Sequence, residues 1–212
     1  KCKRAREISP FMNVMKIYKI NEIFYSLQGE GAYTGRASVF VRFAQCNLAC
    51  TFCDTHFARV AYRFDKNALE SFVFALLEKE HVANKPQIVF TGGEPTLQLC
   101  ESEPLLNGFY RCIETNGYQI APRWIEWVTF SPKTKPIAAS NMQRANEVKI
   151  LYSLFSEEEM ILLVKDYPDK HYFVQAIDRG TRPIQYDSLI AFCKKNPQFR
   201  LSLQTHKILE IN

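Results

Sequence analysis

Short apolar runs that alternate with helix-length segments constrain the fold of this 212-residue chain most strongly. Several of the runs are apolar throughout, which is typical of strands buried on both faces of a parallel sheet. Strands are expected at residues 16–25, 38–43, 87–91, 109–115, 127–130, 147–151, 171–176 and 199–204.

Three helix-length segments separate these strands. Residues 66–81 carry apolar side chains at helical spacing behind the candidate caps Asp65 and Asn67. A second helix is expected at 156–165, where S-x-x-E forms a capping box, and a third at 186–195. Alternating strands and helices favour an α/β fold with a mainly parallel sheet. The chain is shorter than the roughly 250 residues of a full eight-fold barrel, so an open, partial (β/α) barrel is expected.

Composition and charge narrow the class of protein. The chain is 47% hydrophobic, which suits one domain with a sizeable core, expected to span residues 15–212. Residues 1–14 have no clear period and are expected to form a tail or an upstream extension. Four basic residues and one acidic residue among the first seven supply +3 of the net charge of +5, so no nucleic-acid partner is expected. No apolar run reaches the roughly 18 residues of a membrane span, and no signal peptide is expected.

Three cysteines crowd into one short loop, where Cys46, Cys50 and Cys53 form a C-x3-C-x2-C motif. Three cysteines this close cannot pair off evenly as disulfides. Three thiolates on a [4Fe–4S] cluster would leave one iron open to bind a substrate or cofactor. A structural zinc completed by His56 or Cys100 is the alternative, although zinc spacings rarely include the x3 gap. Three buried structural cysteines are less consistent with the polar residues between them.

A glycine turn follows the expected strand at 87–91 in the sequence QIVFTGGEP. Gly92 and Gly93 carry no Cβ and would let the backbone approach a ligand closely. The motifs GGEP, ETNG, SPK and THK each begin where an expected strand ends. Ligands bind beyond the carboxyl ends of parallel strands, so these motifs are expected on one rim.

The cysteine motif with Phe52 before Cys53, followed by GGEP, resembles the radical S-adenosylmethionine enzymes. EIFYSLQGEGAYTGRASVFVR at 22–42, CDT at 53–55, SPK at 131–133 and the terminal LQTHKILEIN are similar to the 7-carboxy-7-deazaguanine synthase family. The resemblance runs from about Met15 to the last residue. It implies ring contraction of 6-carboxy-5,6,7,8-tetrahydropterin to 7-carboxy-7-deazaguanine with loss of ammonia, a step towards queuosine and related deazapurines.

The resemblance also implies three cofactors: the cluster on the three cysteines, S-adenosylmethionine on its open iron, and Mg²⁺ on Thr55. From the pattern alone, a Thr that caps the next segment is the commoner reading. Contacts to S-adenosylmethionine are expected from Phe52, Asp54, Gly92, Gly93, Glu114, Ser131, Pro132 and Lys133. Asn116 is a further candidate, with a turn as the alternative.

The substrate site is expected around Arg42, which lies on an otherwise apolar strand and needs an anionic partner. A substrate carboxylate would satisfy it, and an internal ion pair with Glu22 or Glu30 is equally consistent. Gln28 and Glu30 suit the amide and amino edge of a pterin, with a solvated glycine-rich turn as the alternative. The resemblance adds Leu27, Gly29, Thr91, Gln175, His206 and the terminal carboxylate of Asn212. The alternative for Asn212 is a frayed terminus, and the alternative for His206 is a structural role.

Partners and location follow from the same reasoning. The resemblance implies an electron donor such as flavodoxin or ferredoxin, and a homodimer. Free cysteines and an oxygen-sensitive cluster favour the cytoplasm. Two other functions stay open at this point: an activating enzyme for a glycyl-radical protein, and a non-enzymatic zinc or iron–sulfur module. Cys2, Cys100, Cys112 and Cys193 are expected to be structural.

Overall fold

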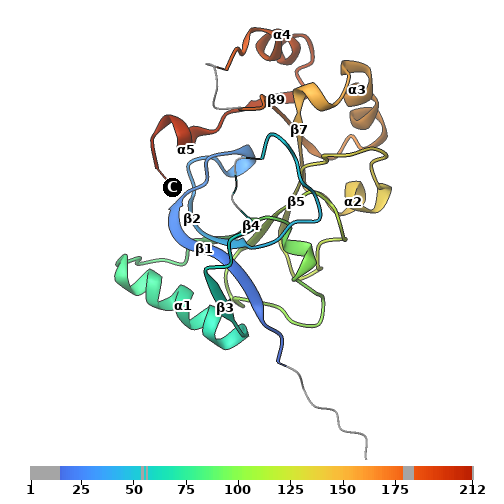
Figure 1. Ribbon diagram of the computed structural model, residues 1–212. Coiled ribbons are helices and arrows are strands. Elements are labelled where there is room, and N and C mark those ends of the chain that lie inside the picture. The colour runs from blue at the N-terminus through green and yellow to red at the C-terminus, as the bar shows by residue number, and fades with distance from the viewer. Residues whose placement is uncertain (1–14, 54, 56, 179–183, 212) are drawn as a thin grey trace, which may run out of the picture.

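The computed structural model describes residues 15–53, 55, 57–178 and 184–211, and its centre is one curved sheet (Figure 1). The strand order is β3-β1-β2-β4-β5-β6-β7-β8-β9. Strand β1 runs antiparallel to β2 and β3, and the pairs from β2 to β9 are parallel. The strands are β1 (Tyr18–Leu27), β2 (Ala37–Phe43), β3 (Tyr62–Phe64), β4 (Gln87–Gly92), β5 (Arg111–Thr115), β6 (Trp127–Phe130), β7 (Glu147–Leu151), β8 (His171–Gln175) and β9 (Phe199–Ser202). Strands β3 and β9 are the two edges of this sheet, so the predicted open, mainly parallel α/β fold is confirmed.

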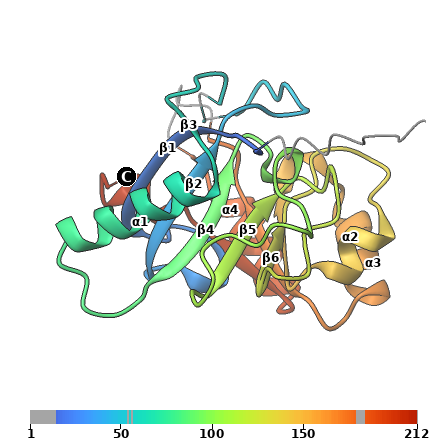
Figure 2. The same cartoon turned by 90° about the horizontal axis from the view of Figure 1, so that it is seen from below.

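Helices α1 to α4 lie in connections between strands and pack outside the sheet, whereas α5 follows the last strand (Figures 1 and 2). They are α1 (Lys66–Lys79), α2 (Ala139–Arg144), α3 (Glu157–Asp166), α4 (Asp187–Lys195) and α5 (Thr205–Ile208), with short 3-10 turns η1 (Gly31–Tyr33), η2 (Pro95–Leu97) and η3 (Tyr152–Leu154). Asp65 caps α1 by accepting a hydrogen bond from Ala68 N at 2.8 Å, and Asn67 lies inside the helix. The predicted capping box of α3 is present, with both reciprocal bonds between Ser156 and Glu159.

The two faces of the sheet bury different side chains, because successive residues of a strand point to opposite sides. On the outer face, Val39 and Val41 of β2 pack in one apolar cluster with Leu69 and Val73 of α1. On the inner face, Phe40 packs with residues of β4 and β5 into a smaller cluster. The inner face turns polar towards the carboxyl ends of the strands, where a pocket forms.

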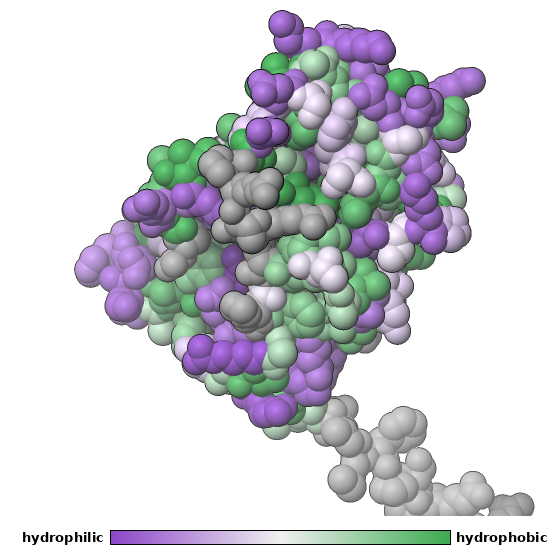
Figure 3. Space-filling view, turned by 45° about the horizontal axis from the view of Figure 1, so that its top comes forward, coloured by the Kyte–Doolittle hydropathy of each residue, from purple (hydrophilic) through white to green (hydrophobic). Residues whose placement is uncertain are grey.

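Hydrophilic side chains cover the outer parts of the face in Figure 3, with hydrophobic side chains between them. On α3, Ile161 and Leu162 are exposed. Among the described residues, no helix has the length and apolarity that a membrane crossing requires.

The differences from the sequence-based expectations involve short elements. Strand β3 has three residues, α2 has six and α5 has four, which is too few for a hydrophobic period to emerge. The expected ends of the longer strands shift by only a few residues, which is the usual uncertainty at element boundaries.

Candidate active site

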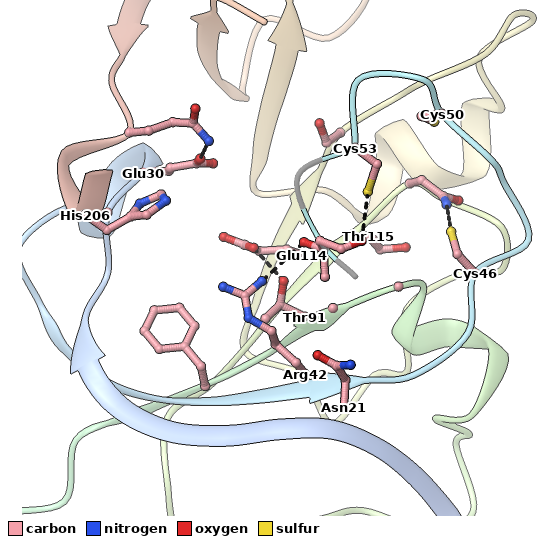
Figure 4. Close-up of a pocket in the computed structure, with 18 of the residues that line it drawn as sticks. Asn21, Glu30, Arg42, Cys46, Cys50, Cys53, Thr91, Glu114, Thr115 and His206 are labelled. Carbon is pink, nitrogen blue, oxygen red and sulfur yellow. Dashed lines mark hydrogen bonds between the residues drawn. The ribbon is translucent and has the colours of Figure 1, made fainter. Parts of the chain in front are cut away.

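A cavity of about 670 Å³ opens on the inner side of the sheet, at the carboxyl ends of the parallel strands. The cysteine loop that follows β2 lines one end of it, and the LQGEG loop after β1 and helix α5 line the other (Figure 4). The motifs that follow β4, β5 and β6 lie between these two ends. The prediction that the motifs gather on one rim is therefore confirmed.

The three motif cysteines are free thiols that line the cavity. Cys53 N–H donates to Cys50 O at 3.1 Å, which turns the loop between them. Cys46 Sγ accepts hydrogen bonds from Leu48 N–H at 3.4 Å and from Asn116 Nδ2 at 3.7 Å. Burial raises the pKa of both the Cys46 and the Cys50 thiol, and a bound metal would displace these protons. Over the described ranges, no three His, Cys, Asp or Glu side chains are already arranged around a common metal position.

The glycine turn after β4 packs against the start of the cysteine loop. Gly92 has a φ of 110°, and a Cβ on it would lie 2.5 Å from Phe43 O. A Cβ on Gly93 would lie 1.9 Å from Gln45 O. Gly93 N–H also donates to Phe43 O at 2.9 Å. The close backbone approach that the glycines predict is thus made to the protein's own chain, next to Cys46.

Glu94, the carboxylate of GGEP, is completely buried and was not among the predicted site residues. It accepts hydrogen bonds from Thr96 N–H and Oγ1 at 3.0 and 2.6 Å. It also accepts bonds from Thr115 Oγ1 and Asn116 N–H, both at 2.7 Å. Four donors satisfy the buried carboxyl oxygens and join the glycine turn to the ETNG segment after β5. Asn116 also lines the cavity, so its expected contact to S-adenosylmethionine stays a prediction.

Glu30 and Lys149 form a buried ion pair at the other end of the cavity, where their side chains are 12% and 9% exposed. Glu30 also accepts hydrogen bonds from Gln175 Nε2 at 3.1 Å and Gln204 Nε2 at 2.9 Å. Burial alone would raise the pKa of Glu30, but Lys149 outweighs this effect and holds the pKa below its ordinary value. Sequence reasoning missed Lys149, although a lysine inside the apolar run EVKIL was a visible signal.

Glu114 bonds to the expected substrate residues. Its carboxylate accepts hydrogen bonds from Gln28 Nε2 at 3.2 Å and from Thr91 Oγ1 at 2.8 Å. Glu30 N–H donates to Gln28 Oε1 at 3.2 Å, which fixes the direction of that amide. Glu114 thus bonds to two residues expected at the pterin, whereas the sequence analysis expected it to contact S-adenosylmethionine.

Arg42 points into the cavity beside Thr91 and Glu114 (Figure 4). Its Nε lies 2.7 Å from Glu22 Oε1, and its Nη1 donates to Thr55 Oγ1 at 3.5 Å. The internal ion pair, one of the two interpretations open at the sequence level, is present with Glu22 as the partner. Because the Glu22 side chain is 52% exposed, this pair is weak and could yield to a bound carboxylate.

Helix α5 closes the cavity against the LQGEG loop. Thr205 donates to Gly29 O from both its N–H at 3.0 Å and its Oγ1 at 2.9 Å. A Cβ on Gly29 would lie 2.1 Å from His206 Nδ1, so a larger residue there would force the histidine side chain to move. The histidine therefore lies directly over the loop that carries Gln28 and Glu30.

Sequence comparison assigns the family. No model of a protein family matches the chain. A 7-carboxy-7-deazaguanine synthase of Bacteroides thetaiotaomicron is 38% identical over 198 residues, covering 91% of this chain and 98% of that protein. The synthase of Bordetella pertussis is also 38% identical, with 92% and 99% covered. The chain belongs to the 7-carboxy-7-deazaguanine synthase family. Its fold matches the crystal structure of QueE from Escherichia coli with a TM-score of 0.68 and 25% identity, covering 89% of this chain and 94% of that one.

Most of the residues expected to form a synthase site lie together. Those that line the cavity are Leu27, Gln28, Gly29, Glu30, Arg42, Cys46, Cys50, Phe52, Cys53, Thr55, Thr91, Gly92, Gly93, Glu114, Ser131, Lys133, Gln175 and His206. Pro132 is not among the lining residues. Asp54, His56 and Asn212 lie outside the described residues, so the expectations for them are not tested by the structure.

Proposed function

We propose that this chain converts 6-carboxy-5,6,7,8-tetrahydropterin to 7-carboxy-7-deazaguanine with release of ammonia. One observation carries the proposal: a single cavity joins a three-thiol loop to a group of amide and carboxylate side chains. The thiol end suits a cluster and its cofactor, whereas the amide and carboxylate end suits the polar edge of a heterocycle. Membership of the synthase family supports the same reaction.

A [4Fe–4S] cluster and S-adenosylmethionine are the proposed cofactors. The donor set fits a cluster, because three thiols without disulfide partners share one loop at the cavity and Cys46 Sγ already accepts two N–H bonds. When bound, the cluster would supply an electron to S-adenosylmethionine, and the cofactor would supply the carbon radical that takes a hydrogen atom from the substrate. Phe52 and Gly93 lie beside the cysteines in the cavity lining and would contact S-adenosylmethionine.

Ser131 and Lys133 supply polar groups between the two ends of the cavity. Lys133 Nζ donates to Ser131 Oγ, and Ser131 in turn donates to Lys149 O at 2.9 Å. Burial, together with the charge of Lys149, lowers the pKa of Lys133 to about 8. A carboxylate of S-adenosylmethionine next to Lys133 would stabilise its charged form, and this ion pair would position the cofactor.

Arg42 is the proposed partner of the substrate carboxylate. Its guanidinium already borders the cavity, and the Glu22 carboxylate that it contacts is half exposed. A substrate carboxylate could replace Glu22 in a bidentate pair without leaving Arg42 unpaired. Thr55 Oγ1, 3.5 Å from Arg42 Nη1, is the proposed protein ligand of Mg²⁺, which would reach the same substrate carboxylate.

The remaining proposals concern the setting of the enzyme. An external donor such as flavodoxin or ferredoxin would deliver the electron, and a homodimer is the proposed assembly. Unpaired thiols that must hold a cluster suit a reducing compartment such as the cytoplasm.

An anaerobic turnover assay tests the proposed function. The reconstituted protein is incubated with carboxytetrahydropterin, S-adenosylmethionine, Mg²⁺ and a reductant, and the ultraviolet spectrum of the product and the ammonia released are measured. The expected result is 7-carboxy-7-deazaguanine and ammonia in equal amounts, and neither product with a Cys50→Ala variant. A reconstituted protein that carries the cluster but leaves the pterin unchanged would overturn the proposal.

A further inference from the structure

Lys149 is a charged residue in the interior whose purpose the proposed reaction does not yet explain. It lies in the middle of β7, its side chain is 9% exposed, and its ammonium contacts Glu30 at the cavity. Replacing a buried ion pair with apolar side chains is often neutral or stabilising, so stability alone is a weak reason for such a pair. The charge on Glu30 is therefore the feature that needs a function.

The carboxylate of Glu30 has room for one more hydrogen bond. An ionised carboxylate has about four acceptor positions on its two oxygens. Lys149 occupies one position on Oε2, and Gln175 Nε2 and Gln204 Nε2 occupy two on Oε1. Counting the bonds from the described part of the chain, one position on Oε2 is left, and the side chain lines the cavity.

The partners of Glu30 are themselves held in one orientation. Ser202 Oγ donates to Gln175 Oε1 at 3.0 Å, so the Nε2 of that amide must face Glu30. Gly31 N–H donates to Ser202 Oγ at 3.4 Å, which directs the hydroxyl proton towards Gln175. Lys149, Gln175 and Gln204 come from β7, from β8 and from the residue before α5. The carboxylate of Glu30 is therefore fixed from three separate segments.

We propose that Lys149 is a positioning residue for substrate recognition, which holds Glu30 ionised and oriented so that its remaining acceptor position receives an N–H of the 2-amino group of the pterin. This inference rests on the proposed function, because it takes the pterin as the ligand. It identifies the amino group as the part of the ring that the Glu30 end of the cavity selects.

The chemistry requires a charged Glu30. A protonated carboxyl group would donate at one oxygen and compete with the amino group of the ligand, whereas a carboxylate only accepts. Burial would raise the pKa of Glu30, and the ammonium of Lys149 is the largest opposing influence. Without Lys149, the side chain would lose both its charge and one of its three supports.

Two ligands and one variant test this inference. The ligands are 6-carboxytetrahydropterin and the corresponding lumazine, in which an oxo group replaces the 2-amino group. Their dissociation constants are measured by anaerobic calorimetry without reductant, so that no chemistry takes place. The wild type is expected to bind the pterin about tenfold to a hundredfold more tightly, as a hydrogen bond to a charged group predicts. Lys149→Met is expected to reduce this ratio to about threefold or less.

A matched lysine provides the control. Lys170 precedes β8 at the opposite end of the strands, where its ammonium lies 2.9 Å from Asp169, and it does not line the cavity. Lys170→Met is expected to keep the selectivity ratio of the wild type. A general loss of packing would weaken both ligands equally, whereas loss of positioning weakens the pterin selectively.

If Lys149→Met alone does not fold, a double variant that combines Glu30→Gln with Lys149→Met takes its place. The double variant leaves no unpaired buried charge, because both charges are removed together. If Lys149 acts through Glu30, the double variant binds the pterin within about threefold of Glu30→Gln alone. A further large loss in the double variant, or full selectivity in Lys149→Met, would overturn the inference.

A wild type that binds the pterin without converting it would refute the proposed reaction alone, and a wild type that binds neither ligand would refute both.

Discussion

Replacing Glu147 by glutamine should change how the stability of the protein depends on pH. Glu147 is buried at the start of β7, where it accepts a hydrogen bond from Ala32 N–H at 2.9 Å. Burial raises its pKa from 4.5 to about 7, although the Ala32 N–H and Lys149 act in the opposite direction and Glu114 adds to the rise. A glutamine has nearly the same shape, keeps the carbonyl acceptor for Ala32 and does not titrate.

The sign follows from the two pKa values. Between pH 4.5 and 7, the native protein retains a proton on Glu147 that the unfolded chain has already released. The stability that this proton contributes is fully present below pH 4.5 and is lost as the pH rises through 7. At about 1.4 kcal/mol per pKa unit, the upper estimate of the loss is about 3 kcal/mol.

Urea denaturation at intervals from pH 4.5 to 8, followed by circular dichroism, measures this effect. The stability of Glu147→Gln relative to wild type should rise by about 3 kcal/mol across the range, or about 6–12 °C in Tm for a chain of this size. Glu78→Gln, on the exposed side of α1, is the control and should follow the wild-type profile. Parallel profiles for Glu147→Gln and wild type would refute the assignment of a buried, proton-retaining carboxyl.

Three further changes test other parts of the site. Gly29→Ala should displace His206 and raise the dissociation constant of the pterin without altering the absorbance of the cluster, since the added Cβ would lie 2.1 Å from Nδ1; unchanged affinity would show that the contact is dispensable. Glu94→Ala should lower the free energy of unfolding by about 3–5 kcal/mol in urea titrations, because four hydrogen-bond donors lose their acceptor; a loss below about 1 kcal/mol would mean that water or a neighbouring group takes its place. Arg42→Met should raise KM for the carboxypterin at least tenfold, and an equal rise for an analogue without the carboxylate would argue against that pairing.

The sequence was most informative where one physical signal dominated. Short apolar runs located eight of the nine strands, and several of these runs are apolar throughout because strands buried on both faces leave few polar positions. Strand β3 was missed because its three residues are exposed or only partly buried and their pattern has no period. The cysteine spacing and the glycine turn located one end of the cavity, because each motif is a short, local pattern in the chain.

The missed residues depend on contacts between distant segments. In the sequence, Glu94 looked like part of a turn. Its role depends on the hydrogen bonds that Thr115 and Asn116, at the end of the next strand, donate to its buried carboxyl group. Lys149 could be read as one polar residue in a strand, and Glu30 lies more than a hundred residues away in the chain. The partner of Arg42 was likewise undecided until the antiparallel pairing of β1 and β2 placed Glu22 opposite it. Local sequence patterns predict helices and strands, whereas the prediction of an ion pair also requires the register in which these elements pack together.

The contacts described above build the two ends of the cavity from different segments of the chain. The thiol-bearing loop is held by the turn after β4, through Gly93 and Phe43, whereas the LQGEG loop is held by α5 and by Lys149. The two ends meet at Glu114, which accepts hydrogen bonds from Gln28 of the LQGEG loop and from Thr91 beside the glycine turn. Substitutions in α5, which contacts Gly29, would leave the hydrogen bonds of the cysteine loop in place. If the proposed function holds, a descendant enzyme could thus acquire a new heterocycle as its substrate while it keeps the same way of starting the reaction.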